Sequence, residues 1–365
     1  MVTINIVSDL ATPHNNCLVQ AIRRVPKTRV VTWYAERVRS SQPWAGPLGG
    51  EVDNHYLNSG LSGLKLLGRA LWRSDETFLL VGYSNGYTRF LMILFTLLRR
   101  PFLYWTDYSA EPGSAFRAVV RKGIYRVLNV SRSHILAVGE RCVKRFVDSG
   151  FSVDRVTNLP IFIDIPPKPN GSPAVRERFG IGAGRRLLVA ASRLSPEKGF
   201  DVLIKAIDLV EPALRGQLSV LIAGSGPEKE RLEKLARCYG VGAQFIFVPW
   251  VEPDEYLRIV SAADVFVHPA LFDAFGASIY AMALGVPVIG SDGAGAPLER
   301  ISHGVNGLIF RRGDAKDLAR CIAALLGNDG LREEIGRRAR QTAERWPPER
   351  GANILLSVVR SMQSR

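Results

Sequence analysis

Short apolar runs alternate with segments of helical periodicity along most of the chain. Five such runs in the first half predict strands, at residues 3–9, 28–34, 77–84, 101–107 and 134–139. Helices are expected around residues 17–25, from about 87 and from about 115. This alternation is typical of a doubly wound parallel sheet with helices on both faces. Ligands bind at the carboxyl ends of such strands, where the predicted loops are 9–16, 82–86 and 106–113.

The same alternation restarts in the second half after a proline-rich break. Residues 165–173, "IPPKPNGSP", hold four prolines and one glycine, which predicts an interdomain linker rather than a helix or central strand. Strands are then expected at 185–192, 218–226, 244–250, 263–269 and 286–292. The predicted divisions are a first Rossmann-like domain at 1–165, a linker region at 166–185, a second Rossmann-like domain at 186–345, and a C-terminal helix at 346–365 that could cross back to the first domain.

Length and charge fit this division. A chain of 365 residues is too long for one hydrophobic core, and two domains facing across a cleft are expected. Residues 1–165 hold 21 Lys and Arg against 12 Asp and Glu, a net charge of +9, whereas the remainder holds 27 against 22, or +5. The excess in the first half predicts an anionic partner there, such as a membrane surface or a phosphorylated substrate.

Cysteine spacing and hydropathy bear on metal sites, disulfides, cellular location and membrane segments. The four cysteines show no CxxC spacing, so neither a zinc site nor a disulfide framework is expected, and a cytoplasmic location is predicted. The N-terminus does not resemble a signal peptide. The longest apolar run, 90–98, is too short to span a bilayer. It is expected to be a buried helix, with a membrane-inserting segment as the alternative.

Two cations lie between a predicted strand and the helix after it. Arg193 and Lys198 are five residues apart, and Gly199 frees the backbone at the turn. Such a pair can clamp a diphosphate, because the guanidinium offers a fork of donors and the ammonium a point charge. Two solvated surface charges would have the same spacing, so both interpretations stay open. Farther on, Gly224 allows a tight strand-to-helix turn, which is also compatible with a plain turn.

The stretch 273–292, "DAFGASIYAMALGVPVIGSD", predicts a loop, a short helix and a buried strand. Asp273 lies in the loop, and the start of the helix exposes unpaired N–H groups where a phosphate can rest. A plain core helix explains the apolar residues but not the Asp-x-Phe-Gly sequence before them. The residues at this predicted helix start are Phe275, Gly276, Ala277 and Ser278.

Taken in order, these motifs resemble the family 4 (group 1) retaining glycosyltransferases of GT-B fold. The motifs are Arg193 with Lys198-Gly199, "AGSGPEKERLEKLA", "SAADVFVHPA", "DAFG", "YAMALGVPVIGSD" and "GVNGLIF". The resemblance covers nearly the whole chain and is strongest over 186–345. It implies a UDP- or GDP-sugar donor substrate, no further cofactor, and a C-terminal domain in which Arg193 and Lys198 neutralise the diphosphate. Leaving-group charge is then stabilised by preorganised electrostatics.

The sequence departs from the family pattern at two acidic positions. The family has a Glu near the reacting carbon, where this chain has Asp273, and a second Glu eight residues later that holds the ribose. Tyr280 occupies the second position and follows Asp273 by seven residues. A phenol cannot chelate two hydroxyls as a carboxylate does, so ribose anchoring is expected to be weaker or supplied by Glu299. A donor-binding subunit without turnover is the alternative that this departure keeps open.

The acceptor side is expected in the first domain. Family members often carry a His at the end of the strand facing the donor, but the strand at 101–107 ends in Asp107. Asp107 is a candidate to orient or deprotonate the acceptor hydroxyl, or else a turn cap. His14 and Asn15 lie in the first predicted strand-to-helix loop, where the family contacts phosphates and acceptor. No Asp-x-Asp pair occurs, so no metal is predicted.

A basic segment in the first domain suggests where the acceptor is held. Residues 115–133 contain five basic residues, no acidic one and an apolar stripe. This pattern suits a helix lying on an anionic membrane, although a solvated outer helix has it too. The overall prediction is a retaining glycosyltransferase, peripheral on the inner face of the cell membrane, acting on a lipid-linked glycan acceptor in cell-surface polysaccharide biosynthesis. A soluble acceptor is the alternative; nucleic-acid binding is not expected.

Overall fold

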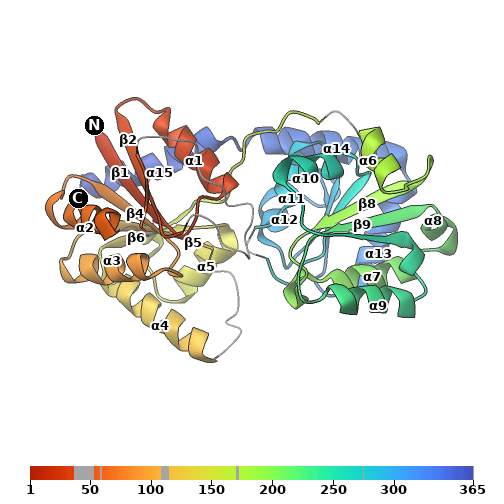
Figure 1. Cartoon of the computed structure of the whole chain (residues 1–365), viewed down its shortest axis with the longest axis horizontal. Helices are drawn as coiled ribbons and strands as arrows, with labels where there is room; N and C mark the ends of the chain where they lie inside the picture. The colour runs from red at the N-terminus through yellow and green to blue at the C-terminus, as the bar shows by residue number, and fades with distance from the viewer. Residues whose placement is uncertain (37–52, 58–59, 108–114, 170–171, 274, 365) are drawn as a thin grey trace. The chain divides into compact units, whose positions relative to one another are not determined.

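The computed structural model describes residues 1–36, 53–57, 60–107, 115–169, 172–273 and 275–364 (Figure 1). They form two compact units. Unit 1 comprises Met1–Asp164 with Pro347–Arg365, and unit 2 comprises Ile165–Trp346. Each unit contains one parallel sheet between two layers of helices, so the predicted α/β class with two doubly wound sheets is confirmed.

The sheet of unit 1 has the order β3-β2-β1-β4-β5-β6-β7, and every pairing is parallel. The chain adds strands outward from β1 to β3 and then returns to the other side of β1 with β4. The direction in which successive strands are added therefore reverses between β1 and β4. Its strands are β1 (Val2–Ser8), β2 (Thr28–Tyr34), β3 (Asn54–Tyr56), β4 (Thr77–Val81), β5 (Phe102–Thr106), β6 (Ser133–Ala137) and β7 (Val156–Asn158).

Among the described residues of unit 1, six helices cover this sheet. One layer holds α1 (Pro13–Arg23) against α15 (Pro348–Gln363), where Gly351 lies close to the side chains of Phe162 and Leu18. The C-terminal helix therefore packs within unit 1. The helices that share the core cluster on the other face are α2 (Gly60–Trp72), α3 (Gly86–Leu97), α4 (Ala115–Val130) and α5 (Glu140–Asp148).

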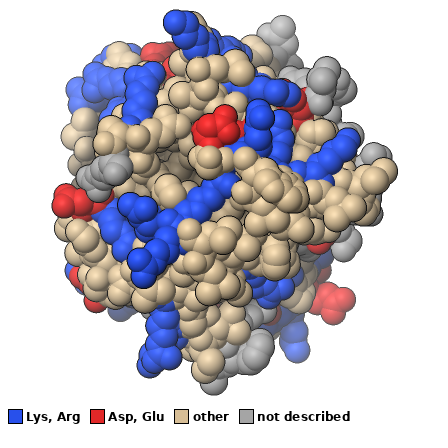
Figure 2. Space-filling view, turned by 90° about the vertical axis from the view of Figure 1, so that its left-hand side faces the viewer, with Lys and Arg blue, Asp and Glu red and all other residues tan. Residues whose placement is uncertain are grey.

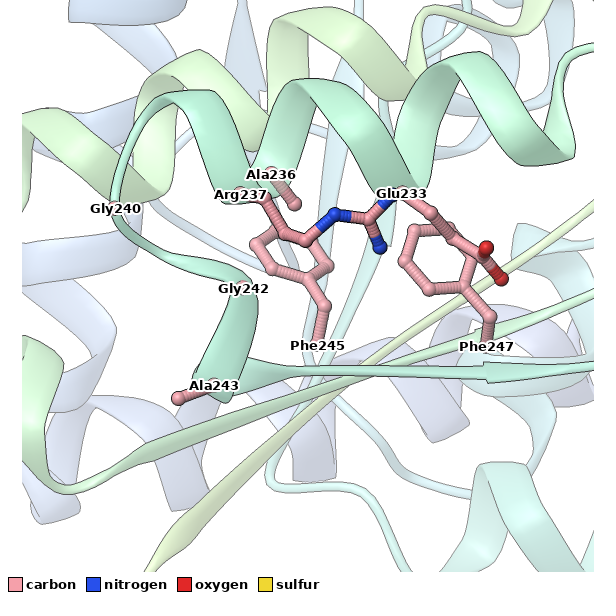
Figure 3. Close-up of a pocket in the computed structure, with 8 residues that line it drawn as sticks. All are labelled: Glu233, Ala236, Arg237, Gly240, Gly242, Ala243, Phe245 and Phe247. Carbon is pink, nitrogen blue, oxygen red and sulfur yellow. The ribbon is translucent and has the colours of Figure 1, made fainter.

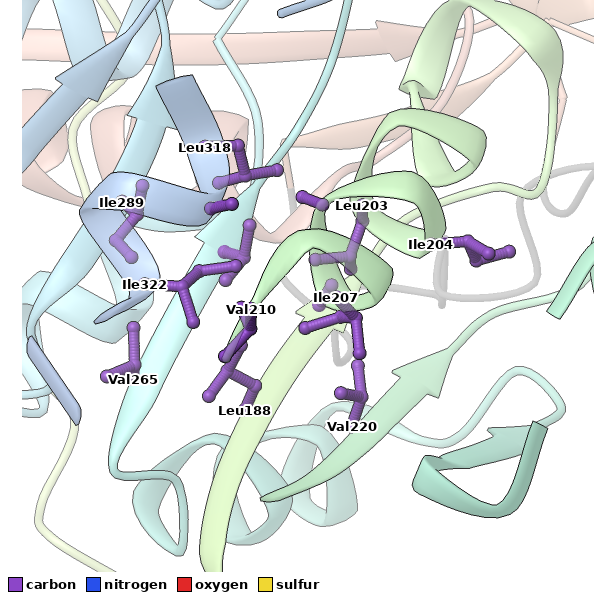
Figure 4. Close-up of a cluster of buried hydrophobic side chains, with 14 of the residues drawn as sticks. Leu188, Leu203, Ile204, Ile207, Val210, Val220, Val265, Ile289, Leu318 and Ile322 are labelled. Carbon is purple, nitrogen blue, oxygen red and sulfur yellow. The ribbon is translucent and has the colours of Figure 1, made fainter. Parts of the chain in front are cut away.

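The sheet of unit 2 has the order β10-β9-β8-β11-β12-β13, again with parallel pairings throughout. The direction of winding reverses between β8 and β11. Alternate residues of β8 enter different cores: Leu188 packs into the cluster of Figure 4, and Val189 packs into the cluster on the opposite face. The strands are β8 (Arg186–Ala191), β9 (Leu218–Ala223), β10 (Phe245–Val248), β11 (Val265–His268), β12 (Val288–Ser291) and β13 (Leu308–Phe310).

The helices of unit 2 lie on both faces of its sheet. Those that contribute to the cluster of Figure 4 are α7 (Phe200–Leu209), α9 (Lys229–Cys238) and α13 (Ala315–Leu326). Those that contribute to the opposite cluster are α6 (Ser172–Arg178), α10 (Pro253–Ser261) and α11 (Ser278–Ala283). Helix α14 (Asp329–Glu344) contributes to both, with Ile335 in the cluster of Figure 4 and Ala339 in the opposite one. The remaining helices are the short α8 (Pro212–Gly216) and α12 (Gly295–Arg300).

Three predictions differ from the structure. Helix α1 begins at Pro13, because Thr12 caps it and proline suits the first turn, so His14 and Asn15 lie in a helix rather than a loop. Helix α6 begins inside the predicted linker and packs on unit 2. The apolar run at 90–98 is predicted to form a buried helix, but helix α3, which contains most of it, is buried on one face only. Parts of the predicted linker and of the loop at 106–113 lie outside the described residues.

Candidate active site

The reversal point of the unit 2 sheet collects the main candidate residues. Lys198 ends the short helical turn Pro196–Lys198 that follows β8. Gly199 has a φ of 66°, and a Cβ there would lie 2.1 Å from the carbonyl oxygen of Pro269, so only glycine permits this close approach. The loop after β8 is thereby held against the loop after β11. Ligands in open α/β sheets bind at such a reversal of strand order.

Lys198, Asp273 and His268 form one polar cluster at this point. The Lys198 Nζ lies 2.8 Å from Asp273 Oδ2, and His268 Nε2 lies 3.1 Å from the same oxygen. A carboxylate only accepts, so Nε2 carries the hydrogen of that bond. His268 Nδ1 lies 3.2 Å from the hydroxyl of Ser278, which fixes the other side of the ring. The structure thus brings together Lys198 and Asp273, which the sequence placed 75 residues apart.

The cluster holds Asp273 as a carboxylate. Burial by itself would raise the pKa of Asp273, but the hydrogen bond and charge of His268 and the charge of Lys198 outweigh it and hold that pKa well below its usual range. The side chains of Lys198 and Asp273 are 18% and 12% exposed, so both remain accessible. An ammonium has three N–H donors, and its bond to Asp273 leaves two for a ligand.

The segment after Asp273 is shaped around His268. Gly276 has a φ of 86°, and a Cβ there would lie 2.1 Å from His268 Cε1, so the glycine makes room for the imidazole. Ser278 is fully buried and Phe275 is 1% exposed. Helix α11 begins only at Ser278 and has six residues. Ser278 therefore acts on the site through His268, and Phe275 is a packing residue whose ring lies 5.5 Å from the guanidinium of Arg300.

Arg193 is exposed on the loop that follows β8, five residues before Lys198. Its charge acts on the same region, as the pKa of Glu197 shows. Burial by itself would raise the pKa of Glu197, but a hydrogen bond donated by Ser195 and the nearby charges of Lys198 and Arg193 lower it. The structure thus places both predicted cations along one edge of the sheet, Lys198 in an ion pair and Arg193 exposed.

The remaining predicted donor residues surround this edge. Gly224 has a φ of 156°, and a Cβ there would lie 1.9 Å from the Ser192 carbonyl oxygen, so this glycine lets two loops touch. Tyr280 is half-buried, and its ring meets that of Tyr256 edge-on at 6.0 Å. The Tyr256 hydroxyl donates to the carbonyl of Ala277. Glu299 lies on α12, which follows β12, and is half-buried.

The reversal point of the unit 1 sheet also carries an aspartate. Asp9 follows β1, and it accepts hydrogen bonds from the hydroxyl of Ser84 and from Asn85 Nδ2 at 2.5 Å. Asn85 also caps α3 by accepting from the backbone N–H of Thr88 at 2.7 Å. Of the predicted acceptor residues, Asp107 is exposed directly after β5.

His268 and Asp9 were not singled out in the sequence. His268 ends the apolar run "DVFVH", where it resembles a core residue, and only its place at the end of a strand hinted at a role. Asp9 likewise stands directly after the first strand.

A hollow at the edge strand β10 is separate from this cluster. It is lined by Phe245, Phe247, Arg237 and Glu233, and the Arg237 side chain lies across the two rings (Figure 3). Phe245 is the first residue of β10, at the amino edge of the parallel sheet, whereas Lys198 and Asp273 follow the carboxyl ends. The hollow is therefore not part of the candidate site.

The described residues hold no group of three or more His, Cys, Asp and Glu side chains arranged to bind a metal ion. No helix among them combines the length and the apolar character needed to cross a membrane.

A model of a known protein family matches most of unit 2. Residues 172–342 match the family model described as glycosyl transferases group 1. The chain is 29% identical over 265 residues to the GDP-mannose-dependent alpha-(1-6)-phosphatidylinositol monomannoside mannosyltransferase of Mycolicibacterium smegmatis, covering 68% of each chain. It is 31% identical over 202 residues to the D-inositol 3-phosphate glycosyltransferase of Saccharomonospora viridis, covering 53% of this chain and 47% of that one. The chain spans about half the length of most such relatives.

Solved structures share the fold over the whole chain. HepE of Anabaena, in complex with UDP, superimposes with a TM-score of 0.77 at 18% identity and covers 100% of both chains. WaaG, a glycosyltransferase involved in lipopolysaccharide biosynthesis, gives a TM-score of 0.67 at 17% identity and covers 97% of this chain and 99% of WaaG. The predicted GT-B fold is confirmed by these similarities.

Proposed function

We propose that this chain is a group 1 glycosyl transferase, which the family match over residues 172–342 supports, and that it is a retaining enzyme that moves a sugar from a nucleotide-diphosphate sugar to a lipid-linked glycan acceptor. The observation that carries this proposal is the cluster of Lys198, His268 and Asp273 at the reversal point of the unit 2 sheet. Around it stand the predicted donor residues, with Arg193 exposed on the neighbouring loop.

The donor diphosphate would bind to Lys198 and Arg193. Lys198 keeps two N–H donors beyond its bond to Asp273, and Arg193 offers a planar fork suited to phosphate oxygens. Both cations stand where charge develops on the leaving phosphate, so they would stabilise the transition state more than the ground state. UDP and GDP both remain candidates: one relative is named as GDP-mannose-dependent, and HepE was solved with UDP.

Asp273 would face the donor sugar. Its carboxylate stays ionised, so it accepts hydrogen bonds and would stabilise positive charge that develops at the reacting carbon, but it has no proton to give. Helix α11 has only six residues, so the proposal rests on Lys198 and Arg193 rather than on the helix end. Tyr280 and Glu299 would contact the nucleoside side of the donor.

The acceptor would bind to unit 1. Asp107, exposed at the carboxyl end of β5, is the proposed base or orienting group for its hydroxyl. Asn15 would offer a polar contact from the first turn of α1, and His14 is proposed from its sequence position alone. A lipid-linked acceptor is supported by the basic residues of 115–133, of which Lys122 and Arg126 are exposed. A peripheral position on the inner face of the cell membrane and a role in cell-surface polysaccharide synthesis complete the proposal.

Donor binding and turnover test the proposal separately. Titration calorimetry with UDP- and GDP-sugars should find one tight donor, and Arg193→Ala should weaken it about tenfold or more, since one charged contact to phosphate is lost. Arg237→Ala, which removes another exposed arginine from α9, is the matched control. Unchanged donor affinity in Arg193→Ala would refute the site.

Release of free nucleotide in the presence of acceptor separates the enzyme from the alternative. A donor that binds but is never consumed, with any acceptor, would favour a nucleotide-sugar-binding subunit without turnover. The replacement of the expected Glu by Tyr280 gives that alternative its basis. The anomeric configuration of the product, read by NMR, tests retention.

A further inference from the structure

Helix α3 has two apolar faces, of which only one is buried. Leu91, Met92 and Phe95 are at most 2% exposed and pack in the unit 1 core. The other face is formed by Phe90, Ile93 and Leu97, which are 53%, 51% and 77% exposed. A surface helix normally turns polar residues to solvent, so this second face requires an explanation.

Helix α2 extends this apolar surface. The Tyr87 ring at the start of α3 lies 3.6 Å from where a Cβ of Gly63 would be, and at the other end Arg100 donates to the carbonyl of Ala70. Side-chain contacts therefore connect the two helices near both ends. Leu61, Leu64 and Trp72 of α2 are all more than 60% exposed. We call the following six side chains the α2–α3 face: Leu61, Leu64, Trp72, Phe90, Ile93 and Leu97.

The helices that form and flank this face carry charge of one sign. Helices α2, α3 and α4 contain no Asp or Glu, whereas Lys65 and Arg89 are exposed on α2 and α3, and Lys122 and Arg126 are exposed on α4. Figure 2 looks onto the side of unit 1 where these helices lie, and it shows many Lys and Arg side chains and few acidic ones between broad areas of other residues. An apolar surface bordered by cations complements an anionic lipid surface.

Unit 2 shows that such a face is not a general property of this chain. Exposed large hydrophobic side chains among its described residues are scattered over separate elements, at Leu209, Tyr239, Leu298 and Val305. Its outer helix α14 pairs its charges instead, as in Arg337 with Glu334 at 2.7 Å. Isolated exposed apolar residues are ordinary, whereas a contiguous group marks an interaction surface.

We propose that the α2–α3 face binds anionic phospholipid bilayers, with its six apolar side chains entering the headgroup boundary and Lys65 and Arg89 contacting lipid phosphates. A second copy of the chain is a poorer occupant, because a twofold contact would bring the same cations together. The proposal extends the membrane position proposed above and moves the contact from α4 to α2 and α3. It rests on exposure and charge alone and requires no transfer activity.

Vesicle flotation with the full chain tests this inference. Wild-type protein should float with vesicles of phosphatidylglycerol and phosphatidylcholine, and the triple variant Phe90→Ser, Ile93→Ser, Leu97→Ser should bind at least tenfold less. The control variant Leu209→Ser, Tyr239→Ser, Val305→Ser removes three exposed apolar side chains from unit 2 and should bind as wild type. Because all these residues are exposed, unchanged melting temperatures are expected and confirm that the variants fold.

A second pair of variants tests the charge. Lys65→Glu with Arg89→Glu should lower binding to the anionic vesicles about tenfold, and added salt should lower wild-type binding. Equal wild-type binding to pure phosphatidylcholine vesicles, or unchanged binding of the apolar triple variant, would overturn the proposal. Self-association that the triple variant abolishes, without any vesicle binding, would assign the face to a second copy. Since flotation needs no donor or acceptor, these results are independent of the proposed transfer reaction.

Discussion

The two sheets reverse direction at corresponding points, and each reversal carries an aspartate in a different setting. In unit 2, Asp273 is bonded by the ammonium of Lys198 and the ring of His268. In unit 1, Asp9 accepts from the hydroxyl of Ser84 and the amide of Asn85. The same topology thus places a carboxylate at both edges, and the neighbouring donors decide what each edge can do.

This difference in donors has a consequence for ligands. Charge-assisted hydrogen bonds are roughly twice as strong as neutral ones, and a lysine with two remaining donors can share its charge with a phosphate. Hydroxyl and amide groups such as Ser84 and Asn85 bring no charge of their own. This difference supports the proposed diphosphate site in unit 2 and makes neutral sugar hydroxyls the more suitable ligands of the unit 1 edge.

Removing the lysine is the strongest way to break the comparison. Lys198→Ala should lower kcat/KM for donor consumption about 10²–10³-fold, the typical loss when one preorganised donor is removed from a transition-state site. Lys205→Ala is the matched control, because Lys205 also pairs with an aspartate, Asp201, but farther along α7 and at 42% exposure. Equal activities of the two variants, measured by nucleotide release, would show that the reversal point of unit 2 is not the donor site.

Filling the space beside His268 should give the next largest effect. Gly276→Ala puts a Cβ 2.1 Å from the imidazole at a φ of 86°, and the free energy of unfolding should fall by about 3 kcal/mol. Gly123→Ala is the control in unit 1: a Cβ there meets nothing within 4 Å, and alanine favours helix α4. Urea denaturation measures both, and a Gly276→Ala variant as stable as wild type would mean that His268 is not held against this loop.

The sequence allowed much of the unit 2 edge to be predicted. Apolar runs located β8, β11 and β12, and parallel strands end at one edge, so Lys198 and Asp273 were expected near the same ligand. The direct ion pair between them was not predictable, because it depends on the Gly199 turn and on which way each side chain points. His268 was missed because a histidine that ends an apolar strand has the pattern of a core residue.

The outer helices of unit 1 were harder to predict. Residues 90–98 are apolar on every side, which in periodicity alone indicates burial all round. Burial also depends on what packs on each face, and the sequence does not state that. Helix α1 shows the opposite case: Thr12 and Pro13 are local signals for a helix start that a boundary drawn from apolar periodicity passed over.

Acidification should weaken the unit 2 cluster with a defined sign. The folded-state pKa of Asp273 is depressed, so this carboxylate stabilises the fold above its unfolded pKa of about 3.9, and the contribution is lost as pH falls below that value toward the folded pKa. Between pH 7 and pH 3 the wild type should lose about 1.3 kcal/mol more stability than Asp273→Asn, because each pH unit below the unfolded pKa removes at most about 1.4 kcal/mol. Asp254→Asn, on the outer helix α10, controls for the change in net charge. Parallel pH curves for wild type and Asp273→Asn, from urea unfolding, would contradict this assignment.

The smallest effect is expected from the unit 1 edge. Asn85→Ala removes both the amide that bonds Asp9 and the cap that accepts from Thr88, so the free energy of unfolding should fall by about 1 kcal/mol, as for other lost caps. Donor affinity should stay within twofold of wild type, because no cation of the diphosphate site has changed. Asn328→Ala, which removes the corresponding cap of α14 in unit 2, should cost a similar amount of stability and is the control. A tenfold loss of donor affinity in Asn85→Ala alone would mean that the neutral edge of unit 1 also binds the donor. The proposal that only the reversal point of unit 2 binds the donor would then be wrong.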